Sequence, residues 1–128
     1  MSGSRRPIVA GNWKMNTTIS EGLALVDALL PLIGEIGAVD RVVCPPFVSL
    51  YPISERLRAT GIQVGAQNAS NEPKGAFTGE ISLTMLSGLV QYVIIGHSER
   101  RSIFGETDET VAKKIKSVQA GGLLPILC

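Results

Sequence analysis

The sequence predicts an α/β protein whose core is a parallel sheet. Short apolar runs alternate along the chain with longer segments in which apolar residues recur at helical spacing. Several of the runs are apolar almost throughout, as is typical of strands that helices cover on both faces. The length of 128 residues, of which 45% are hydrophobic and 18% charged, suits one globular domain. In such a protein the chemistry is expected where strands end.

Five of the apolar runs are predicted to be strands. They are residues 8–12, 39–44, 62–67, 92–95 and 123–128. The last run has no helix after it, whereas each earlier one is followed by a loop or helix. A bare last strand would leave an unpaired edge, so we expect the sequence to be a fragment of a longer array of strand–helix units.

Three segments between the strands are predicted to be helices because their apolar residues form a stripe. They are residues 20–35, 48–60 and 107–120. Thr18 and Glu21 have the spacing of a capping box at the start of the first helix, and Pro31 is expected to kink or shorten that helix. Gly61 is expected to end the second helix in the left-handed conformation, and Gly121 is expected to terminate the third.

The third predicted helix carries most of its charge in two groups. Lys113, Lys114 and Lys116 are expected to form a solvated face of the helix. Glu106 and Asp108 lie at its start, where acidic side chains ordinarily stabilise the helix dipole. Neither group is assigned to chemistry.

Polar side chains suited to catalysis follow two of the predicted strands. The segment 96–101 brings a histidine to the end of the fourth strand, and the segment 11–16 brings an amide and an ammonium to the end of the first. Together they suggest a site for a small anionic substrate. Taken singly, the histidine could be satisfied by local backbone, the lysine could be a surface residue, and the asparagine could cap a turn.

Composition excludes several other classes of function. The formal net charge is +1, with 12 basic and 11 acidic side chains interspersed, so no partner is expected among nucleic acids or acidic membranes. No apolar stretch approaches the roughly 20 residues that a membrane helix needs. A single histidine and two cysteines, Cys44 and Cys128, without a CxxC or HExxH spacing, predict no metal and no cofactor. A cytoplasmic protein with free thiols is expected.

Four motifs carry a resemblance to a known family. They are Gly11-Asn12-Trp13-Lys14-Met15-Asn16, Gln67-Asn68, Lys74-Gly75-Ala76-Phe77-Thr78-Gly79-Glu80 and Gly96-His97-Ser98-Glu99-Arg100-Arg101. In this order they resemble the N-terminal half of the triosephosphate isomerases. The resemblance implies a (β/α)₈ TIM barrel, of which residues 1–128 form the first four βα units and a fifth strand of one domain. The C-terminal half would be absent, because such barrels have about 250 residues.

The resemblance also implies an activity and its residues. The family interconverts D-glyceraldehyde 3-phosphate and dihydroxyacetone phosphate by proton transfer through an enediol or enediolate, in glycolysis and gluconeogenesis. His97 matches the electrophile, and a helix N-terminus beside it would favour the neutral imidazole. Lys14 matches the catalytic cation that also binds the substrate phosphate, and Asn12 matches a substrate-binding amide. Ser98 and Glu99 match supporting residues.

Homodimer formation is a further implication of the resemblance. The long polar loop 68–80 matches a projection that inserts into the neighbouring subunit, with Phe77 and Thr78 at its tip and Met15 at the same interface. An ordinary lid or surface excursion remains the alternative for this loop. Arg100 and Arg101 are expected to form structural ion pairs, with Glu80 as the partner of Arg100.

The family's general base lies in the segments that this chain lacks. The chain alone is therefore expected to be inactive unless it meets its missing half. One alternative is a non-catalytic half-barrel module that binds sugar phosphates and closes by self-association. An alternative fold, an open flavodoxin-like sheet, would bind a ligand at its switch point.

Overall fold

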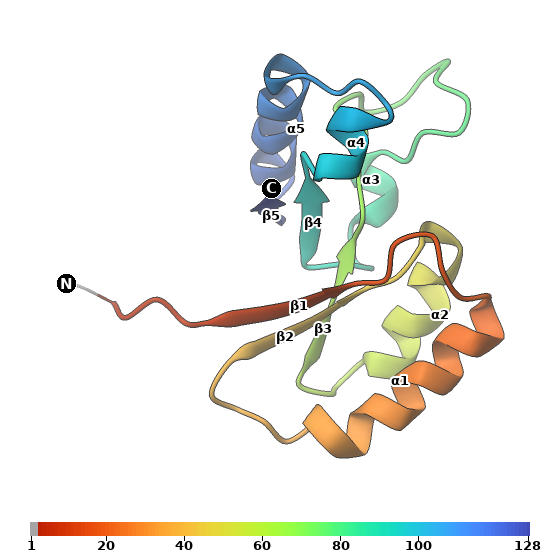
Figure 1. Cartoon of the computed structure of the whole chain (residues 1–128), viewed down its shortest axis with the longest axis vertical. Coiled ribbons are helices and arrows are strands. Elements are labelled where there is room, and N and C mark those ends of the chain that lie inside the picture. The colour runs from red at the N-terminus through yellow and green to blue at the C-terminus, as the bar shows by residue number, and fades with distance from the viewer. Residues whose placement is uncertain (1–2) are drawn as a thin grey trace. The chain divides into compact units, whose positions relative to one another are not determined.

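The computed structural model describes residues 3–128 (Figure 1). Helices and strands alternate along the chain, except that two helices lie between the last two strands. The strands are β1 (Ile8–Asn12), β2 (Asp40–Cys44), β3 (Ile62–Ala66), β4 (Tyr92–Ile95) and β5 (Leu124–Leu127), and the helices are α1 (Ile19–Ile33), α2 (Phe47–Leu57), α3 (Leu83–Leu86), α4 (Ser98–Ser102) and α5 (Asp108–Ala120). Every neighbouring pair of strands is parallel, in the order β1-β2-β3-β4-β5.

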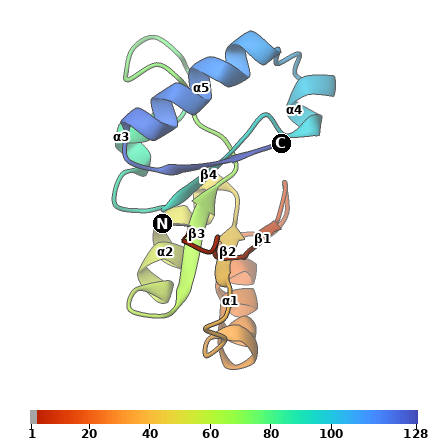
Figure 2. The same cartoon turned by 90° about the vertical axis from the view of Figure 1, so that its left-hand side faces the viewer.

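The chain divides into two compact units, Met1–Val64 and Gly65–Cys128. In the first unit, α1 and α2 lie side by side next to the strands (Figures 1 and 2). Its core is formed by buried aliphatic side chains from both helices and from β2 and β3: Val26, Val42, Val43, Leu50, Ile53, Leu57, Ile62 and Val64. The hydrophobic stripe predicted for each helix is therefore the face that packs.

The predicted capping box at α1 is confirmed. The Thr18 hydroxyl accepts a hydrogen bond from the Glu21 backbone N–H, and the Glu21 carboxylate accepts one from the Thr18 N–H. Pro31 lies in the last turn of α1, which ends two residues later. The predicted stop of α2 is wrong in detail, because Ala59 takes the left-handed φ of 61°. Gly61 instead leaves room for the Arg41 guanidinium, which donates to its carbonyl.

In the second unit, α5 packs beside β4 and β5 (Figure 2). The core of this unit includes the buried aliphatic side chains of Leu86, Val93, Ile95, Val111 and Val118. Gly121 is the C-cap of α5, as predicted, and the residue after it, Gly122, takes the left-handed φ of 75°. The short helix α3 was not predicted, and α4 was expected only as a helix N-terminus beside His97, without bounds, because four or five residues are too few to show a helical period.

Candidate functional site

The loop after β1 holds its backbone by hydrogen bonds from several directions. The Asn12 side-chain oxygen accepts from the Lys14 N–H at 2.9 Å, and the Asn16 amide donates to the Trp13 carbonyl at 2.7 Å. Within this loop Lys14 has φ 57° and Thr17 has φ 74°, a backbone conformation that residues other than glycine rarely adopt. Such strain persists only where the surroundings impose it, and it clusters at functional sites. The loop therefore fixes the backbone from which the exposed Lys14 side chain extends.

The Asn12 side chain can fill both roles considered for it, capping a turn and binding substrate. Its oxygen caps the turn that carries Lys14. Its amide nitrogen still carries two N–H donors, which is the group a substrate oxygen would need. The register pairs Asn12 with Cys44 at the ends of β1 and β2. Cys44 is fully buried, and burial raises the pKa of its thiol to about 12, so Cys44 offers no thiolate at neutral pH.

The end of β4 is built around a glycine in a crowded position. Gly96 has φ 73°, and a Cβ atom there would lie 3.0 Å from Val111 Cγ1 and 3.2 Å from both Arg101 Nη2 and the Cys128 carbonyl oxygen. Only glycine combines this conformation with this close approach. The tight turn delivers His97 directly to the N-cap of α4.

The His97 ring is held by the first turn of α4. Its Nδ1 atom accepts a hydrogen bond from the Glu99 backbone N–H at 3.3 Å. A ring nitrogen that accepts cannot carry a proton, so the neutral ring has its proton on Nε2. The Glu99 Oε2 atom lies 3.4 Å from Nδ1, and in this tautomer Nδ1 has no proton to donate to it. The side chain is 23% exposed, which leaves the ring accessible to a ligand.

Ser98 and Glu99 both belong to α4. Glu99 contributes its backbone N–H to His97 and keeps its carboxylate beside the same ring nitrogen. Ser98 is exposed, and its carbonyl oxygen accepts from the Ser102 hydroxyl at 2.8 Å. Of the five predicted site residues, the structure thus joins His97 with Glu99 and Asn12 with Lys14 by hydrogen bonds.

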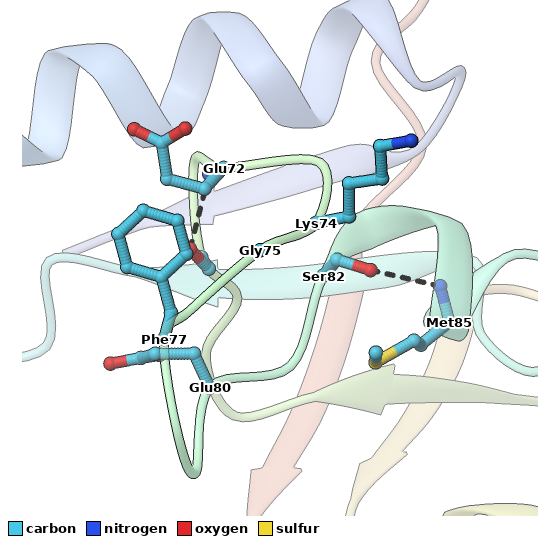
Figure 3. A pocket seen from close by; sticks show the side chains of 8 residues that line it. Glu72, Lys74, Gly75, Phe77, Glu80, Ser82 and Met85 are labelled. Carbon is cyan, nitrogen blue, oxygen red and sulfur yellow. Dashed lines mark hydrogen bonds between the residues drawn. The ribbon is translucent and has the colours of Figure 1, made fainter.

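The loop between β3 and α3 is ordered by its own hydrogen bonds. The Ser70 N–H donates to the Ile81 carbonyl at 2.8 Å and closes the base, while the Glu80 N–H donates to the Phe77 carbonyl at the tip. Figure 3 shows the Phe77 ring on one wall of a shallow pocket in this loop, with Met85 on another wall and Lys74 pointing away from Phe77. Phe77 is 47% exposed and Thr78 is exposed. The loop therefore presents an apolar ring to its surroundings.

Met15 is predicted to lie at the same interface as this loop. It follows Lys14 in the loop after β1, and its side chain is 94% exposed. The placement of Met15 at an interface stays a prediction, since single exposed apolar side chains are common on protein surfaces.

A buried ionic cluster was missed by the sequence predictions. Lys114 and Glu106 form an ion pair in which both side chains are less than 10% exposed, at 8% and 7%. Lys114 also donates to Asn68 Oδ1 at 3.0 Å, and Arg100 Nε lies 3.1 Å from Glu106 Oε2 as an ion pair without an aligned hydrogen bond. The prediction that Lys114 faces solvent is wrong, and so is the pairing of Arg100 with Glu80. The signal was present, since Val111, Lys114 and Val118 share one helical stripe.

The cluster sets the protonation of its carboxylate. Burial alone would raise the pKa of Glu106, but the hydrogen bond and charge of Lys114, together with the charge of Arg100, outweigh burial and hold that pKa below its usual range. Glu106 is therefore a firmly ionised group that bridges two cations. It does not act only on a helix dipole, as its sequence position suggested.

No group of three or more potential metal ligands occurs within residues 3–128. The same residues contain no helix long and apolar enough to cross a membrane.

Comparison with known proteins gives the family of the chain. The family model for Triosephosphate isomerase matches residues 7–128. The chain belongs to the triosephosphate isomerase family. A triosephosphate isomerase of Dehalococcoides mccartyi is 54% identical over 124 residues, which are 97% of this chain and 49% of the relative. One from Clostridium tetani is 54% identical over 98% of this chain and 49% of the relative.

A solved structure extends the match to the fold. The crystal structure of triosephosphate isomerase from Bartonella henselae superposes with a TM-score of 0.90 at 36% identity, over 97% of this chain and 52% of that chain. The predicted fold is confirmed: the strands and helices are those of four βα units and a fifth strand of a TIM barrel. The chain spans about half the length of the triosephosphate isomerases that it matches.

Proposed function

We propose that residues 1–128 are the N-terminal half of a single TIM-barrel domain in a triosephosphate isomerase. The complete enzyme would interconvert D-glyceraldehyde 3-phosphate and dihydroxyacetone phosphate. One observation carries the proposal beyond family membership: the His97 Nδ1 atom accepts the Glu99 N–H, which puts the ring proton on Nε2. A neutral imidazole with a free N–H is an electrophile that can donate to a substrate oxygen and recover its proton in the same cycle.

The reaction moves a proton between two adjacent carbons through an enediolate. His97 would donate its Nε2–H to the oxygen on which negative charge develops, and Lys14 would place its ammonium near the phosphate and the same developing charge. Asn12 would orient substrate through its amide N–H groups while its oxygen holds the Lys14 turn. Ser98 and Glu99 would support the site through α4, which carries His97 at its N-cap.

The proton-abstracting base is proposed to come from the C-terminal half of the family's barrel. Glu106 is a poor candidate because it bridges Lys114 and Arg100 and its pKa is lowered, so it has little tendency to accept a proton. Asp108 pairs with Arg101 and its side chain is 96% exposed, whereas a general base works in a site that excludes water. We therefore propose that the 128-residue chain alone is inactive.

The proposed working form is a homodimer in the cytoplasm. The apolar exposure of Met15 and Phe77 supports an interface at the loops that carry them, with Thr78 beside Phe77 at the loop tip. The cytoplasm is proposed because glycolysis, the pathway that the family's name implies, takes place there.

A second candidate is a non-catalytic half-barrel that binds sugar phosphates and closes by self-association. Exposed apolar residues on β1 and β5 favour association of the chain with a second polypeptide, either another copy or a C-terminal half. The stoichiometry of the folded chain separates the two candidates. A stable complex formed by two copies, with no other polypeptide, would favour the module, and a stable complex with a C-terminal half would favour the isomerase.

The test of the proposed function is an assay of triose phosphate interconversion by the chain, with and without a separately expressed C-terminal half taken from the Clostridium tetani relative. We expect turnover only in the mixture. His97→Ala in the chain should reduce that turnover by about 10²- to 10⁴-fold, the usual contribution of a positioned acid–base group. Turnover by the chain alone, or a mixture in which His97→Ala is as active as the parent, would refute the assignment.

A further inference from the structure

The orientation of the His97 ring depends on α4, a helix too short to be stable on its own. The ring is fixed through the Glu99 N–H, which belongs to the first turn of α4. This helix has only five residues, Ser98–Ser102, and none of them is buried. Isolated helices of this length are not stable in water, because nucleation costs more than so few hydrogen bonds return. Contacts outside the helix must keep it in place.

Two ion pairs connect α4 to the residues at and just before the start of α5, and they differ in how far they are exposed to solvent. Arg101 pairs with Asp108, whose side chain is 96% exposed, so that pair contributes little. Arg100 pairs with Glu106, whose side chain is 7% exposed, and its own backbone carbonyl accepts the Glu106 N–H at 3.0 Å. The Arg100 guanidinium also lies over the Phe104 ring, 4.9 Å from its centroid. Glu106 is therefore the principal anchor of α4 among these contacts.

Glu106 is itself held in place by a second cation, Lys114 on α5. Its Oε1 atom pairs with Lys114 on α5, while its Oε2 atom faces Arg100. Lys114 is fixed in turn by Asn68 Oδ1, at 3.0 Å, from the segment after β3. Each carboxylate oxygen thus serves one cation, and the two cations belong to different helices.

We propose that Glu106 is a positioning residue for His97, acting through Arg100 and α4. Lys114, which is buried, is held by the half-buried Asn68. Glu106 transmits the position of Lys114 to Arg100, and α4 then presents the Glu99 N–H to His97 Nδ1. The catalytic importance of this relay rests on the proposed function, whereas the geometry of the relay does not.

The sequence offers a direct readout, because His97 is the only histidine of the chain. In the 128-residue chain labelled with ¹⁵N-histidine, the two imidazole nitrogens give a single pair of signals, whose shifts distinguish the tautomers. They are recorded at about pH 8, above the ordinary titration range of histidine. The parent should show one tautomer, protonated at Nε2. In Glu106→Gln we expect the two shifts to move toward a common average, because Nδ1 has lost its fixed donor.

Asp108→Asn is the matched control, since it also removes one carboxylate from an arginine of α4 but at an exposed site. It should keep the shifts of the parent. Parent-like shifts in a folded Glu106→Gln chain would overturn the proposal, and so would a parent chain that shows both tautomers.

Glu106→Gln leaves Lys114 buried without its carboxylate and can unfold the chain for that reason alone. The double variant Glu106→Gln/Lys114→Met removes both charges and so separates stability from positioning. We expect it to fold and still to show averaged shifts, because Arg100 again lacks its anchor. Parent-like shifts in the double variant, or its failure to fold, would overturn the proposal, since Glu106 would then serve stability alone.

Turnover provides a second measurement, whose outcome is independent of the tautomer result. In the mixture with the C-terminal half, Glu106→Gln should lower kcat on the order of 10- to 100-fold, the cost of a small misplacement of a catalytic group, with little change in KM. Averaged shifts without a loss of turnover would confirm the relay and count against the catalytic role of His97. An inactive parent mixture would refute the proposed function and leave the tautomer result standing.

Discussion

Lys14 combines a backbone that opposes folding with a side chain proposed to act in catalysis. Its φ of 57° costs free energy in any residue with a Cβ atom, and Asn12 and the surrounding loop impose it. Lys14→Gly and Lys14→Ala both remove the ammonium, but only glycine relieves the strain. We expect Lys14→Gly to be about 1 kcal/mol more stable than Lys14→Ala in urea unfolding. Equal stability of the two variants would show that the loop is unstrained.

The two thiols should differ strongly in reactivity. Burial raises the pKa of Cys44 to about 12, whereas Cys128 is exposed. At about pH 8 the folded chain should be alkylated by iodoacetamide at Cys128 and not at Cys44, as followed by mass spectrometry of peptides. The control is the chain in denaturant, in which both thiols should react. Rapid alkylation of Cys44 in the folded chain would contradict its burial.

At the scale of elements, the start of α1 is an independently testable feature. The Thr18 hydroxyl satisfies the Glu21 N–H, which has no partner within the helix. Thr18→Ala should lower the free energy of unfolding by about 1 kcal/mol, while Thr18→Ser, which keeps the hydroxyl, should change it by only a few tenths. Thermal unfolding followed by circular dichroism at 222 nm measures the difference. A cap without energetic value would leave the alanine and serine variants alike.

The connection between α4 and α5 should depend on acid. Because the folded-state pKa of Glu106 lies below its ordinary value of 4.5, its ion pairs stabilise the fold above that value and lose their effect as the pH falls through the folded pKa. Near neutral pH, Glu106→Gln should lower the free energy of unfolding by about 3 kcal/mol. That difference should shrink as the pH falls below 4.5, in urea titrations of both chains. A difference independent of pH would mean that the carboxylate charge is not involved.

The elements show where sequence reasoning succeeds. The strands at residues 8–12 and 92–95 were predicted with the bounds that the structure has, because compact apolar runs between turn-forming residues leave little freedom. The capping box at Thr18 was readable since both of its partners lie within four residues of each other. Local patterns of this kind need no knowledge of the tertiary fold.

The failures arise where a contact distant in the sequence decides the local structure. Lys114 is buried because Asn68, 46 residues away, and Glu106 supply acceptors for its ammonium. Ala59 adopts the left-handed conformation predicted for Gly61, while Gly61 makes room for Arg41 from another strand. For the candidate site, sequence motifs predicted His97 and Lys14 but not the cluster around Glu106, since ion-pair partners cannot be assigned from composition.

At the scale of the whole molecule, apolar side chains remain exposed on the strands that end the described sheet. Val9 and Ile8 on β1, and Leu124 and Leu127 on β5, are all exposed. The chain alone should therefore bind the dye ANS, and addition of the C-terminal half should reduce the fluorescence because those side chains become covered. The C-terminal half alone serves as the control for its own dye binding. Fluorescence equal to the sum of the separate halves would count against complementation.

The crowded turn at Gly96 has a consequence for which sequences this protein can tolerate. Gly88, Gly96 and Gly105 all have positive φ, but a Cβ atom at Gly88 or Gly105 would meet nothing within 4 Å. In a library of all single substitutions, those two positions should accept asparagine, the non-glycine residue that best tolerates this conformation. Position 96 should admit glycine alone, because a Cβ atom there would lie 3.0 to 3.2 Å from three neighbouring atoms, which would have to move, in addition to the backbone strain. The boundary between β4 and His97 is thus a point at which the chain has almost no freedom to vary.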